Sequence, residues 1–467
     1  MRPPKPVKIL PHLEITAMAS NGCGIARNEG KVVFVKQAVP GDQADVRLTL
    51  DKKSFAEGEI AALHQSSSQR VTPPCAHFGT CGGCTWQQLD YQAQLQYKTQ
   101  IVEDALIRIG KLEIAEVRPI IGCDKAYGYR NKMEYSFTNR AWLTQEEIDS
   151  GENFDRRGLG FHVPGNFMGV LNVEQCFLQE DLGNRIRNGV RHFALKNNYS
   201  FFNQKTQEGL LRNLMLRTAT TGEVMVLLSV TAPEMEAISA LMEFCKTTFP
   251  EITSLQYVVN GKKNSTIYDL QPQVYHGNSF IYEQLGSYRF KIQPKSFFQT
   301  NSRQAQVLYD VVKDFAALQP DDHVYDLYTG VGSIGIYLSD ACRQVVGIEQ
   351  VADAIVDAKE NAALNQVSNC SFHTGDVRLL LNDEFLAAHG KPSVVVTDPP
   401  RAGMHADVVR TLLAATPPRL VYVSCNPATQ ARDIDLLSEK YRVSKIQPVD
   451  MFPQTTHIEN VALLELK

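Results

Sequence analysis

DLYTGVGSIGIYL (326–338) is the stretch that decides the fold of this chain. It continues an apolar run, and Gly330, Gly332 and Gly335 fall where a strand would turn into a helix. Glycines at such a turn let a ligand approach the backbone closely, as in nucleotide-binding α/β domains. About 20 residues further on, the next apolar run ends in Glu349, whose carboxylate can accept from both ribose hydroxyls. Taken alone, the pattern also fits a dinucleotide enzyme or a tight turn without a ligand.

Outward from this turn, short apolar runs alternate with helical stretches. This rhythm predicts an α/β fold, a Rossmann-like parallel sheet covered by helices on both faces. Asp376 is expected at the end of the third strand, and Asp398, in TDPPRAGM (397–404), at the end of the fourth. Ligands bind at this edge of open α/β sheets, and polar groups at successive strand ends favour a methyltransferase over a dehydrogenase. Arg401 stands where enzymes that methylate exocyclic amines usually have an aromatic residue, which makes amine methylation less favoured.

The fifth expected strand, RLVYVSCNPAT (419–429), brings Cys425 to the same edge of the sheet. A lone cysteine at the end of a core strand is most often a buried structural residue. This one falls where the methyl group of a bound donor should lie, which favours a nucleophile. Because a free thiol is little ionised at neutral pH, we expect the site to assist its ionisation. The last strand is expected to pair antiparallel beside the strand that carries Cys425, and the loop leading into it supplies two candidate bases, His457 and Glu459.

The chain before this region divides into two further parts. Residues 7–64 contain short apolar runs separated by glycine and proline, which predicts a small β-barrel. CAHFGTCGGC (75–84) holds three cysteines, an amphipathic helix is expected near 87–110, and the charged stretch 144–157 is expected to be a loop insertion. The expected domains are 1–66, a barrel; 67–296, a mixed α+β central domain; and 297–467, an α/β catalytic domain.

Composition narrows the class of protein. With 467 residues, 43% hydrophobic and 21% charged, the chain is typical of a multidomain globular protein. The absence of a long apolar run and of a signal-peptide core predicts a cytoplasmic protein with no membrane partner. In such a compartment, clustered cysteines indicate metal binding or catalysis rather than disulfides. A net charge of −4 does not by itself indicate nucleic-acid binding, which depends on the local field of one face.

Five motifs together resemble the bacterial RNA 5-methyluridine methyltransferases: FFQTN (297–301), DLYTGVGSIG, TDPPRAGM, VYVSCNP and THIENVALL. The resemblance covers essentially the whole chain. It implies a class I methyltransferase that transfers a methyl group from S-adenosylmethionine to C5 of a uracil in RNA. By position, it makes Cys425 the nucleophile and Glu459, rather than His457, the base. The pocket for cofactor and substrate would be lined by Gln299, Tyr328, Gly330, Gly332, Ser333, Glu349, Asp376 and Asp398.

Two branches of that family differ in their N-terminal parts. The transfer-RNA enzyme lacks a barrel and a cysteine cluster, whereas the ribosomal-RNA enzymes have both, as this chain does. The resemblance therefore implies 23S ribosomal RNA as the substrate, with transfer RNA as the second candidate. It also identifies the barrel as an OB-like, RNA-binding TRAM domain. In the central domain, Arg130 and Lys132 are candidates for phosphate contacts, or else solvated surface charges.

The resemblance also implies a [4Fe–4S] cluster, a group that thiolates bind. Its ligands would be Cys75, Cys81, Cys84 and Cys176. Spacing alone would favour a structural zinc site, which four cysteines also suit. A rival hypothesis from another class is an RNA-binding or redox-sensing protein that keeps the cluster and no longer methylates. We expect the protein to be a monomer.

Overall fold

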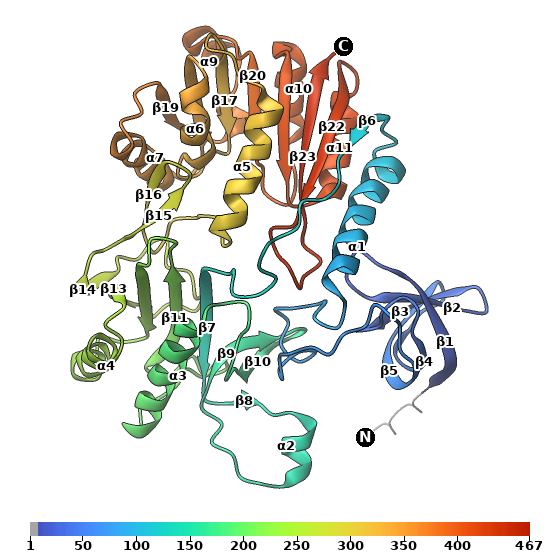
Figure 1. The fold of residues 1–467 in the computed structure, drawn as a ribbon. Coiled ribbons are helices and arrows are strands. Elements are labelled where there is room, and N and C mark those ends of the chain that lie inside the picture. Colours follow the sequence, from blue (N-terminus) through green and yellow to red (C-terminus); the bar gives the residue numbers. More distant parts are fainter. Residues whose placement is uncertain (1–7) are drawn as a thin grey trace.

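Three parts of the protein are visible in Figure 1: a barrel, a central sheet with two helices, and a C-terminal sheet covered by helices. The structure is a computed structural model that describes residues 8–467. Residues 1–7, which belong to the expected barrel domain and to the stretch searched for a signal peptide, lie outside the described residues. Within residues 8–467, we find no helix with the length and apolarity needed to cross a membrane.

The N-terminal part is a closed barrel with strand order β1-β2-β3-β5-β4. Its strands are β1 (Ile9–Met18), β2 (Gly24–Asn28), β3 (Lys31–Lys36), β4 (Gln43–Asp51) and β5 (Phe55–Gln65). Alternate residues of a strand point to opposite faces, so apolar side chains such as Ile15, Val33 and Val46 fill the interior. The predicted barrel is confirmed.

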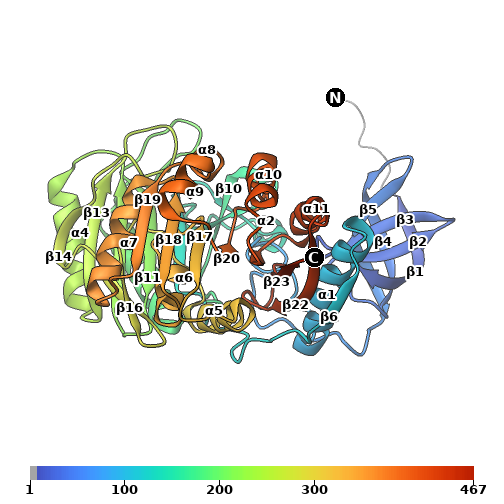
Figure 2. The ribbon, with the colours of Figure 1, turned by 90° about the horizontal axis from the view of Figure 1, so that it is seen from above.

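A helix leads from the barrel to the C-terminal sheet (Figures 1 and 2). It comprises α1 (Tyr91–Asp104), capped by Asp90, and a π-helical turn η1 (Ala105–Ile109), as the sequence predicted. The next strand, β6 (Ile114–Val117), pairs in parallel with β22 (Tyr441–Val449) at the edge of that sheet. This segment was expected in the central domain, but it extends the catalytic sheet. The division into three domains otherwise stays a proposal.

The central part is a sheet of order β14-β13-β12-β11-β7-β9-β10-β8. Its elements are β7 (Lys132–Thr138), β8 (Ala141–Trp142), β9 (Gly158–Val163), β10 (Asn166–Asn172), α3 (Asp181–Lys196), β11 (Leu211–Thr218), β12 (Val224–Val230), α4 (Met235–Thr248), β13 (Ile252–Val259) and β14 (Gln273–Gly277). One face packs against α3 and α4 through residues such as Leu214 and Leu228. The alternate residues Met215 and Leu227 face the core of the C-terminal part, so the two parts share a packed boundary.

The charged stretch 144–157 is not only a loop. It contains α2 (Gln145–Ser150), which begins with a reciprocal capping box between Thr144 and Glu147. The sequence TQEE has the Ser/Thr-x-x-Glu spacing of such a box, a signal that the loop prediction overlooked.

The C-terminal part is a sheet of order β19-β18-β17-β20-β21-β23-β22-β6. After the hairpin β15 (Ile281–Leu285) and β16 (Tyr288–Ile292), its elements are α5 (Ser302–Ala316), β17 (His323–Leu327), α6 (Ser333–Leu338), η2 (Ser339–Ala341), β18 (Gln344–Glu349), α7 (Ala352–Leu364), β19 (Cys370–Thr374), α8 (Val377–Leu380), α9 (Asp383–His389), β20 (Val394–Thr397), α10 (Ala406–Ala415), β21 (Arg419–Ser424), α11 (Pro427–Leu437), β22 and β23 (Glu459–Leu466). Strands β17 to β21 run parallel, and β23 lies antiparallel between β21 and β22. The predicted α/β fold is confirmed.

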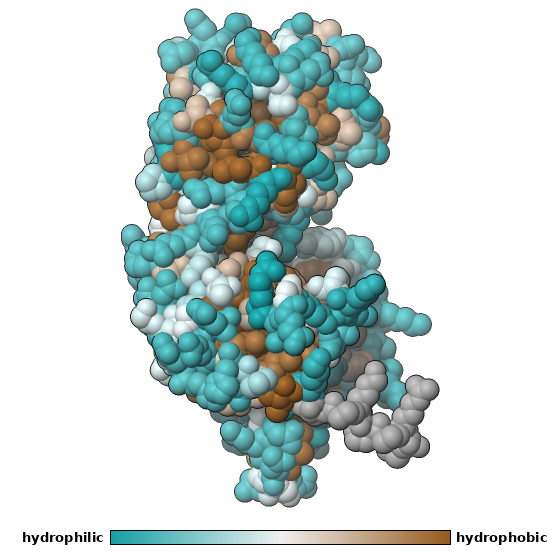
Figure 3. Space-filling view, turned by 90° about the vertical axis from the view of Figure 1, so that its right-hand side faces the viewer, coloured by the Kyte–Doolittle hydropathy of each residue, from teal (hydrophilic) through white to brown (hydrophobic). Residues whose placement is uncertain are grey.

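Both faces of this sheet are covered, as a parallel sheet requires. Alternate valines of β20 and β21 pack with α5, α6 and α7 on one face, while their neighbours pack with α10, α11 and η1 on the other. The chain runs outward from β17 to β19 and returns to β20 beside β17. The carboxyl ends of β17 and β20 therefore border the switch point, the place at which α/β sheets bind ligands. Figure 3 shows an indentation between the upper and lower parts of the molecule.

Candidate active site

The turn after β17 is shaped by backbone conformations that favour glycine. Tyr328, Gly330 and Gly332 have φ of 64°, 55° and 80°. The Oδ2 of Asp326 closes the turn, because it accepts from Thr329 Oγ1 at 2.5 Å and from the Gly335 N–H at 2.9 Å. A Cβ on Gly330 would meet no atom within 4 Å, so this backbone borders open space. The turn therefore leaves room for a ligand at the switch point.

Glu349 connects the ends of the first two strands. Its Oε2 accepts from the Gly330 N–H at 3.2 Å, and its Oε1 accepts from the Val351 N–H at 2.9 Å. A carboxylate has about four acceptor positions, so two remain for a ligand. Asp376 follows β19 and caps α8 by accepting from the Arg378 N–H at 2.9 Å. Burial raises the pKa of Tyr328 to about 12, and the negative charges of Asp376 and Glu349 contribute to the same increase.

The other predicted cofactor residues lie around this turn or next to the central sheet. Ser333 is the first residue of α6, and its Oγ shares a hydrogen bond of 2.8 Å with Tyr309 OH. Asp398 directly follows β20, and burial, with the nearby Asp326 carboxylate, raises its pKa to about 7. Gln299 precedes α5 and lines the cavity described below. Asp326 was part of the quoted motif but was not singled out from the sequence.

Cys425 and Glu459 meet where the ladder between β21 and β23 ends. Ser424 is paired with Asn460 in this antiparallel ladder. Cys425, which follows Ser424, therefore lies opposite Glu459, which precedes Asn460. Glu459 is buried, and its burial together with the Asp398 carboxylate raises its pKa well above the usual value. The sequence predicted this antiparallel neighbour, and the strand pairing confirms it.

The thiol of Cys425 is not activated by the protein alone. Burial, and then the carboxylates of Glu459 and Asp398, raise its pKa to about 11, while Arg401 acts in the opposite direction by charge and a hydrogen bond. The expectation that the site assists ionisation is therefore wrong for the chain by itself. The physical reason is that two acidic groups and one guanidinium surround a partly desolvated sulfur.

His457, the other candidate base, is held by Arg401. An Nη2 of Arg401 lies 3.2 Å from His457 Nδ1, and Thr455 Oγ1 accepts from the His457 N–H at 3.2 Å. Burial and the positive charges of Arg401, Lys98 and Arg130 lower the pKa of His457 to about 4. At neutral pH this imidazole is neutral and a weak base. Sequence analysis did not pair Arg401 with His457, because no local spacing connects them.

The loop that carries His457 is fixed by the helix after the barrel. Lys98 Nζ donates to Asp450 Oδ1 at 2.6 Å and to the Phe452 carbonyl at 3.1 Å, and both charged side chains are fully buried. Tyr91 OH donates to Asp450 Oδ2 at 3.0 Å. Burial lowers the pKa of Lys98, and the Asp450 carboxylate opposes that effect. A paired buried charge is costly to break, so this contact holds the loop in one position.

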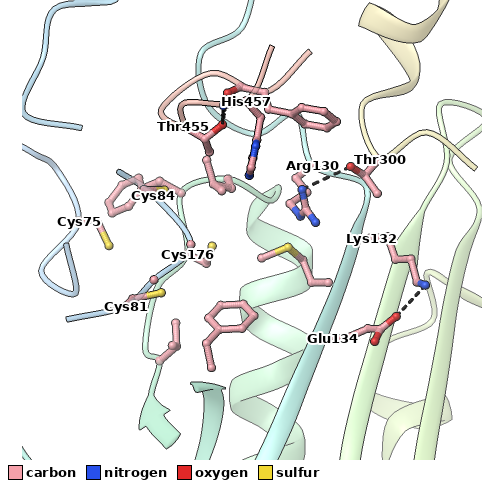
Figure 4. Close-up of a pocket in the computed structure, with 18 of the residues that line it drawn as sticks. Cys75, Cys81, Cys84, Arg130, Lys132, Glu134, Cys176, Thr300, Thr455 and His457 are labelled. Carbon is pink, nitrogen blue, oxygen red and sulfur yellow. Dashed lines mark hydrogen bonds and ion pairs between the residues drawn. The ribbon is translucent and has the colours of Figure 1, made fainter. Parts of the chain in front are cut away.

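A cavity of about 810 Å³ lies between the cysteine-containing segment that follows the barrel, the central part and the C-terminal part of the protein. The four predicted cluster cysteines lie on one side, Arg130 and Lys132 on the other, and His457 above them (Figure 4). Its further lining includes Phe297, Gln299, Arg401 and Thr455. Phe297 is 72% exposed, so its ring is available for stacking. Cations and an exposed aromatic around one opening suit a nucleic-acid base and its phosphates.

The four cysteines are close enough for the charge of one thiolate to raise the pKa of another. Cys75, Cys81 and Cys176 each contribute to raising the pKa of Cys84 to about 12, although burial is the larger cause. The segment around Cys176 is held by Asn184, whose Oδ1 accepts from the Cys176 N–H at 2.8 Å. The structure thus brings Cys176, remote in sequence, to the other three.

Comparison with known proteins matches these features to one family. A family model described as tRNA (uracil-5-)-methyltransferase matches residues 276–467, and a TRAM domain model matches residues 12–61. An uncharacterized RNA methyltransferase of Bacteroides thetaiotaomicron is 50% identical over 96% of this chain and 100% of that protein. The chain belongs to the RNA 5-methyluridine methyltransferase family. A second uncharacterized RNA methyltransferase of the same kind, from Porphyromonas gingivalis, is 46% identical over 97% of this chain and 99% of that protein.

The same family includes a solved structure that matches nearly the whole chain. It is the Pyrococcus abyssi tRNA (uracil-54, C5)-methyltransferase in complex with S-adenosyl-L-homocysteine, with a TM-score of 0.75 and 29% identity. The match covers 97% of this chain and 99% of that one, so it includes the barrel. The expectation that a transfer-RNA enzyme lacks a barrel is wrong for this relative. Membership of the family makes this protein an S-adenosylmethionine-dependent enzyme that acts on RNA.

Proposed function

We propose that this protein methylates C5 of a uridine in 23S ribosomal RNA through a covalent bond between Cys425 and C6 of the base. The observation that carries the proposal is the meeting of Cys425 and Glu459 at the edge where the sheet binds ligands. The ribosomal substrate rests on the resemblance of the motifs and the cysteine cluster to the ribosomal-RNA branch. The barrel does not separate the two substrates, because the match to the Pyrococcus abyssi transfer-RNA enzyme includes it. Transfer RNA is the second candidate, because the Pyrococcus abyssi relative is named for that substrate.

The chemistry follows from the weak nucleophilicity of C5 of uracil. The thiolate of Cys425 adds to C6, which turns the ring into an enolate with a nucleophilic C5. S-adenosylmethionine supplies the methyl group that C5 takes up. Glu459 then removes the proton from C5, the bond between sulfur and C6 breaks, and the thiolate is released. Glu459 suits this step better than His457, because its pKa is raised whereas that of His457 is lowered to about 4.

The thiol must still lose its proton. Arg401 is the cation of this chain that favours the thiolate, since it lowers the pKa of Cys425 by its charge and a hydrogen bond. A target base inside folded RNA must leave its stack to reach this thiolate. We propose that the cavity beside Arg401 receives that base, with Arg130 and Lys132 on its phosphates.

The substrate is tested by mass-spectrometric mapping of 5-methyluridine in RNA from strains with and without the gene. We expect a 5-methyluridine in 23S ribosomal RNA to disappear in the deletion strain and to return when the wild-type gene is restored. A loss confined to transfer RNA would contradict the ribosomal assignment and support the second candidate. The purified protein, incubated with 23S ribosomal RNA or transfer RNA, gives the same comparison directly.

Glu349 is proposed to hold the ribose of S-adenosylmethionine with the two acceptor positions that its backbone contacts leave. Loss of a hydrogen bond to a charged group costs about 1.5–3 kcal/mol, which corresponds to roughly a 10- to 100-fold change in affinity. We expect Glu349→Ala to weaken S-adenosylmethionine binding by that factor in calorimetry. The matched control is Glu360→Ala on α7, whose carboxylate pairs with Lys291 Nζ at 2.8 Å. Equal affinity of the Glu349→Ala and control proteins would contradict this role.

We infer that the cysteine cluster holds iron and sulfur rather than zinc. Four thiolates suit either group, but zinc with bonds of about 2.3 Å would bring tetrahedral sulfurs to about 3.8 Å from one another. Among residues 8–467, no three of the four sulfurs lie within 4.8 Å of one another. This wider spacing fits a group of several atoms, as a [4Fe–4S] cluster is. The cluster lines the cavity, so we propose that it shapes the RNA-binding side of the site.

The cluster can be tested by replacing one ligand. We expect Cys84→Ser to lose most of the iron and the visible absorption of the protein purified without oxygen. Cys23→Ser is the control, because Cys23 is also half-buried but lies in the barrel. Wild-type protein that contains stoichiometric zinc and no iron would contradict the assignment.

A further inference from the structure

Two histidines and an aspartate meet on the surface of the barrel, away from the residues that line the cavity. Asp45 Oδ1 lies 2.8 Å from His64 Nε2 and accepts from the His12 N–H at 2.9 Å. The two imidazole rings are stacked, with centroids 4.4 Å apart and planes at 28°. One ligand atom from each residue lies within 4.8 Å of the others, and both histidines are exposed.

The barrel brings these residues together by irregular pairing. His12 is on β1, Asp45 on β4 and His64 on β5. The register between β1 and β4 shifts between Leu10 and Leu13, and the register between β4 and β5 shifts next to Asp45. Bulges of this kind redirect side chains and are found next to functional sites.

The backbone of His12 also indicates that this cluster is a functional site. Its φ is 53°, in the left-handed region that few residues other than glycine adopt. Such a conformation is strained and persists only where the surroundings fix it. In this barrel, it places the His12 ring over the ring of His64 and beside Asp45.

The donor set is that of a transition-metal site. Two imidazole nitrogens and one carboxylate oxygen are ligands that zinc and related ions prefer, with water in the remaining positions. Nitrogen and oxygen ligands at about 2.0–2.2 Å from a zinc ion lie roughly 3.3–3.6 Å from one another. The three ligand atoms lie within 4.8 Å of one another, and His64 Nε2 and Asp45 Oδ1 are 2.8 Å apart, so small shifts of the side chains would place all three around one ion. Because both histidines are exposed, an ion and its water ligands can reach the site from solvent.

We propose that His12, Asp45 and His64 form a binding site for one divalent transition-metal ion of the zinc class. The site is independent of the methyl-transfer chemistry and of the cysteine cluster. The ion joins β1, β4 and β5, so it stabilises the barrel in its closed form. The ion binds the folded barrel and not the unfolded chain. The melting temperature of the protein should therefore rise with the logarithm of the metal concentration.

Metal titration of the full-length protein, with the cysteine cluster intact as purified, tests the proposal. Zinc is added to wild type, to His64→Ala and to His192→Ala, a control at another exposed histidine. We expect wild type and the control to bind one more zinc ion per chain than His64→Ala does. We also expect zinc to raise the melting temperature of the first two proteins only. Equal stoichiometry and affinity in all three proteins would overturn the proposal.

Two further measurements separate a metal site from a purely structural hydrogen-bonded triad. Asp45→Asn keeps a carbonyl oxygen for both hydrogen bonds but removes the charge, so we expect the barrel to stay folded and zinc affinity to fall at least tenfold. A structural triad would leave zinc affinity unchanged. In wild type loaded with Co²⁺ at this site, the visible spectrum should lack sulfur-to-cobalt charge transfer. A spectrum showing only sulfur ligation would also overturn the proposal.

Discussion

A Cys425→Ala protein is expected to lose RNA methylation by at least about 10⁴-fold, because no other group at this edge of the sheet can add to C6. Cys425 directly follows β21, opposite Glu459, and Arg401 donates to its sulfur. Without the sulfur, C5 of the base stays a weak nucleophile and the methyl group is not transferred. The change removes one sulfur atom from a half-buried side chain, so the fold should persist.

The measurement is transfer of a labelled methyl group to RNA, together with calorimetric binding of S-adenosylmethionine. Binding should stay within about twofold of wild type, which places the loss in the chemical step. Cys370→Ala is the matched control, since Cys370 begins β19 and therefore lies at the opposite edge of the same sheet. Methylation by the Cys425→Ala protein at the rate of this control would contradict the covalent mechanism.

The parts of the fold that follow from local pattern could be predicted from the sequence. The glycine turn after residue 326 and the alternation of strands and helices determine the C-terminal sheet, because each signal lies within one element. The position of β6 could not be predicted. Its four residues, IAEV, contain no signal for the distant strand β22, and only the packing of α1 against the C-terminal part brings it there.

In the candidate site, too, the features that follow from local sequence could be predicted, and those that depend on distant segments could not. The placement of Cys425 and Glu459 follows from the order of the strands, so the sequence could predict that they meet. The raised pKa of Cys425 and the lowered pKa of His457 could not be predicted, since both depend on burial and on charges contributed by other segments. The metal site in the barrel was missed for a related reason, because it depends on irregular strand pairing beside Asp45.

Glu459→Gln is expected to trap the enzyme on its RNA. The neutral amide has nearly the shape of the carboxyl group, so thiolate addition and methyl transfer can proceed, but the C5 proton has no acceptor. Without its removal, the bond between Cys425 and C6 cannot break. We expect release of methylated RNA to slow by about 10²–10⁴-fold. The product is a covalent complex that survives denaturing electrophoresis and has the mass of protein plus methylated RNA.

Glu465→Gln is the matched control, because Glu465 lies on the same strand, β23, at its more exposed end, where it pairs with Arg442. This control should release RNA at the wild-type rate. His457→Gln tests the rival base. The low pKa of His457 makes it a poor proton acceptor, so this variant should affect RNA binding or Cys425 reactivity through Arg401 and should accumulate no adduct.

The combined variant Cys425→Ala with Glu459→Gln separates a trapped intermediate from tight binding. If the complex is the covalent adduct of Cys425, the double variant forms none, whatever its affinity for RNA. If Glu459→Gln turns over normally and His457→Gln accumulates the adduct instead, then His457 is the base and the electrostatic argument from burial fails. The raised pKa of Glu459 would then reflect only its position beside Asp398 in a desolvated pocket.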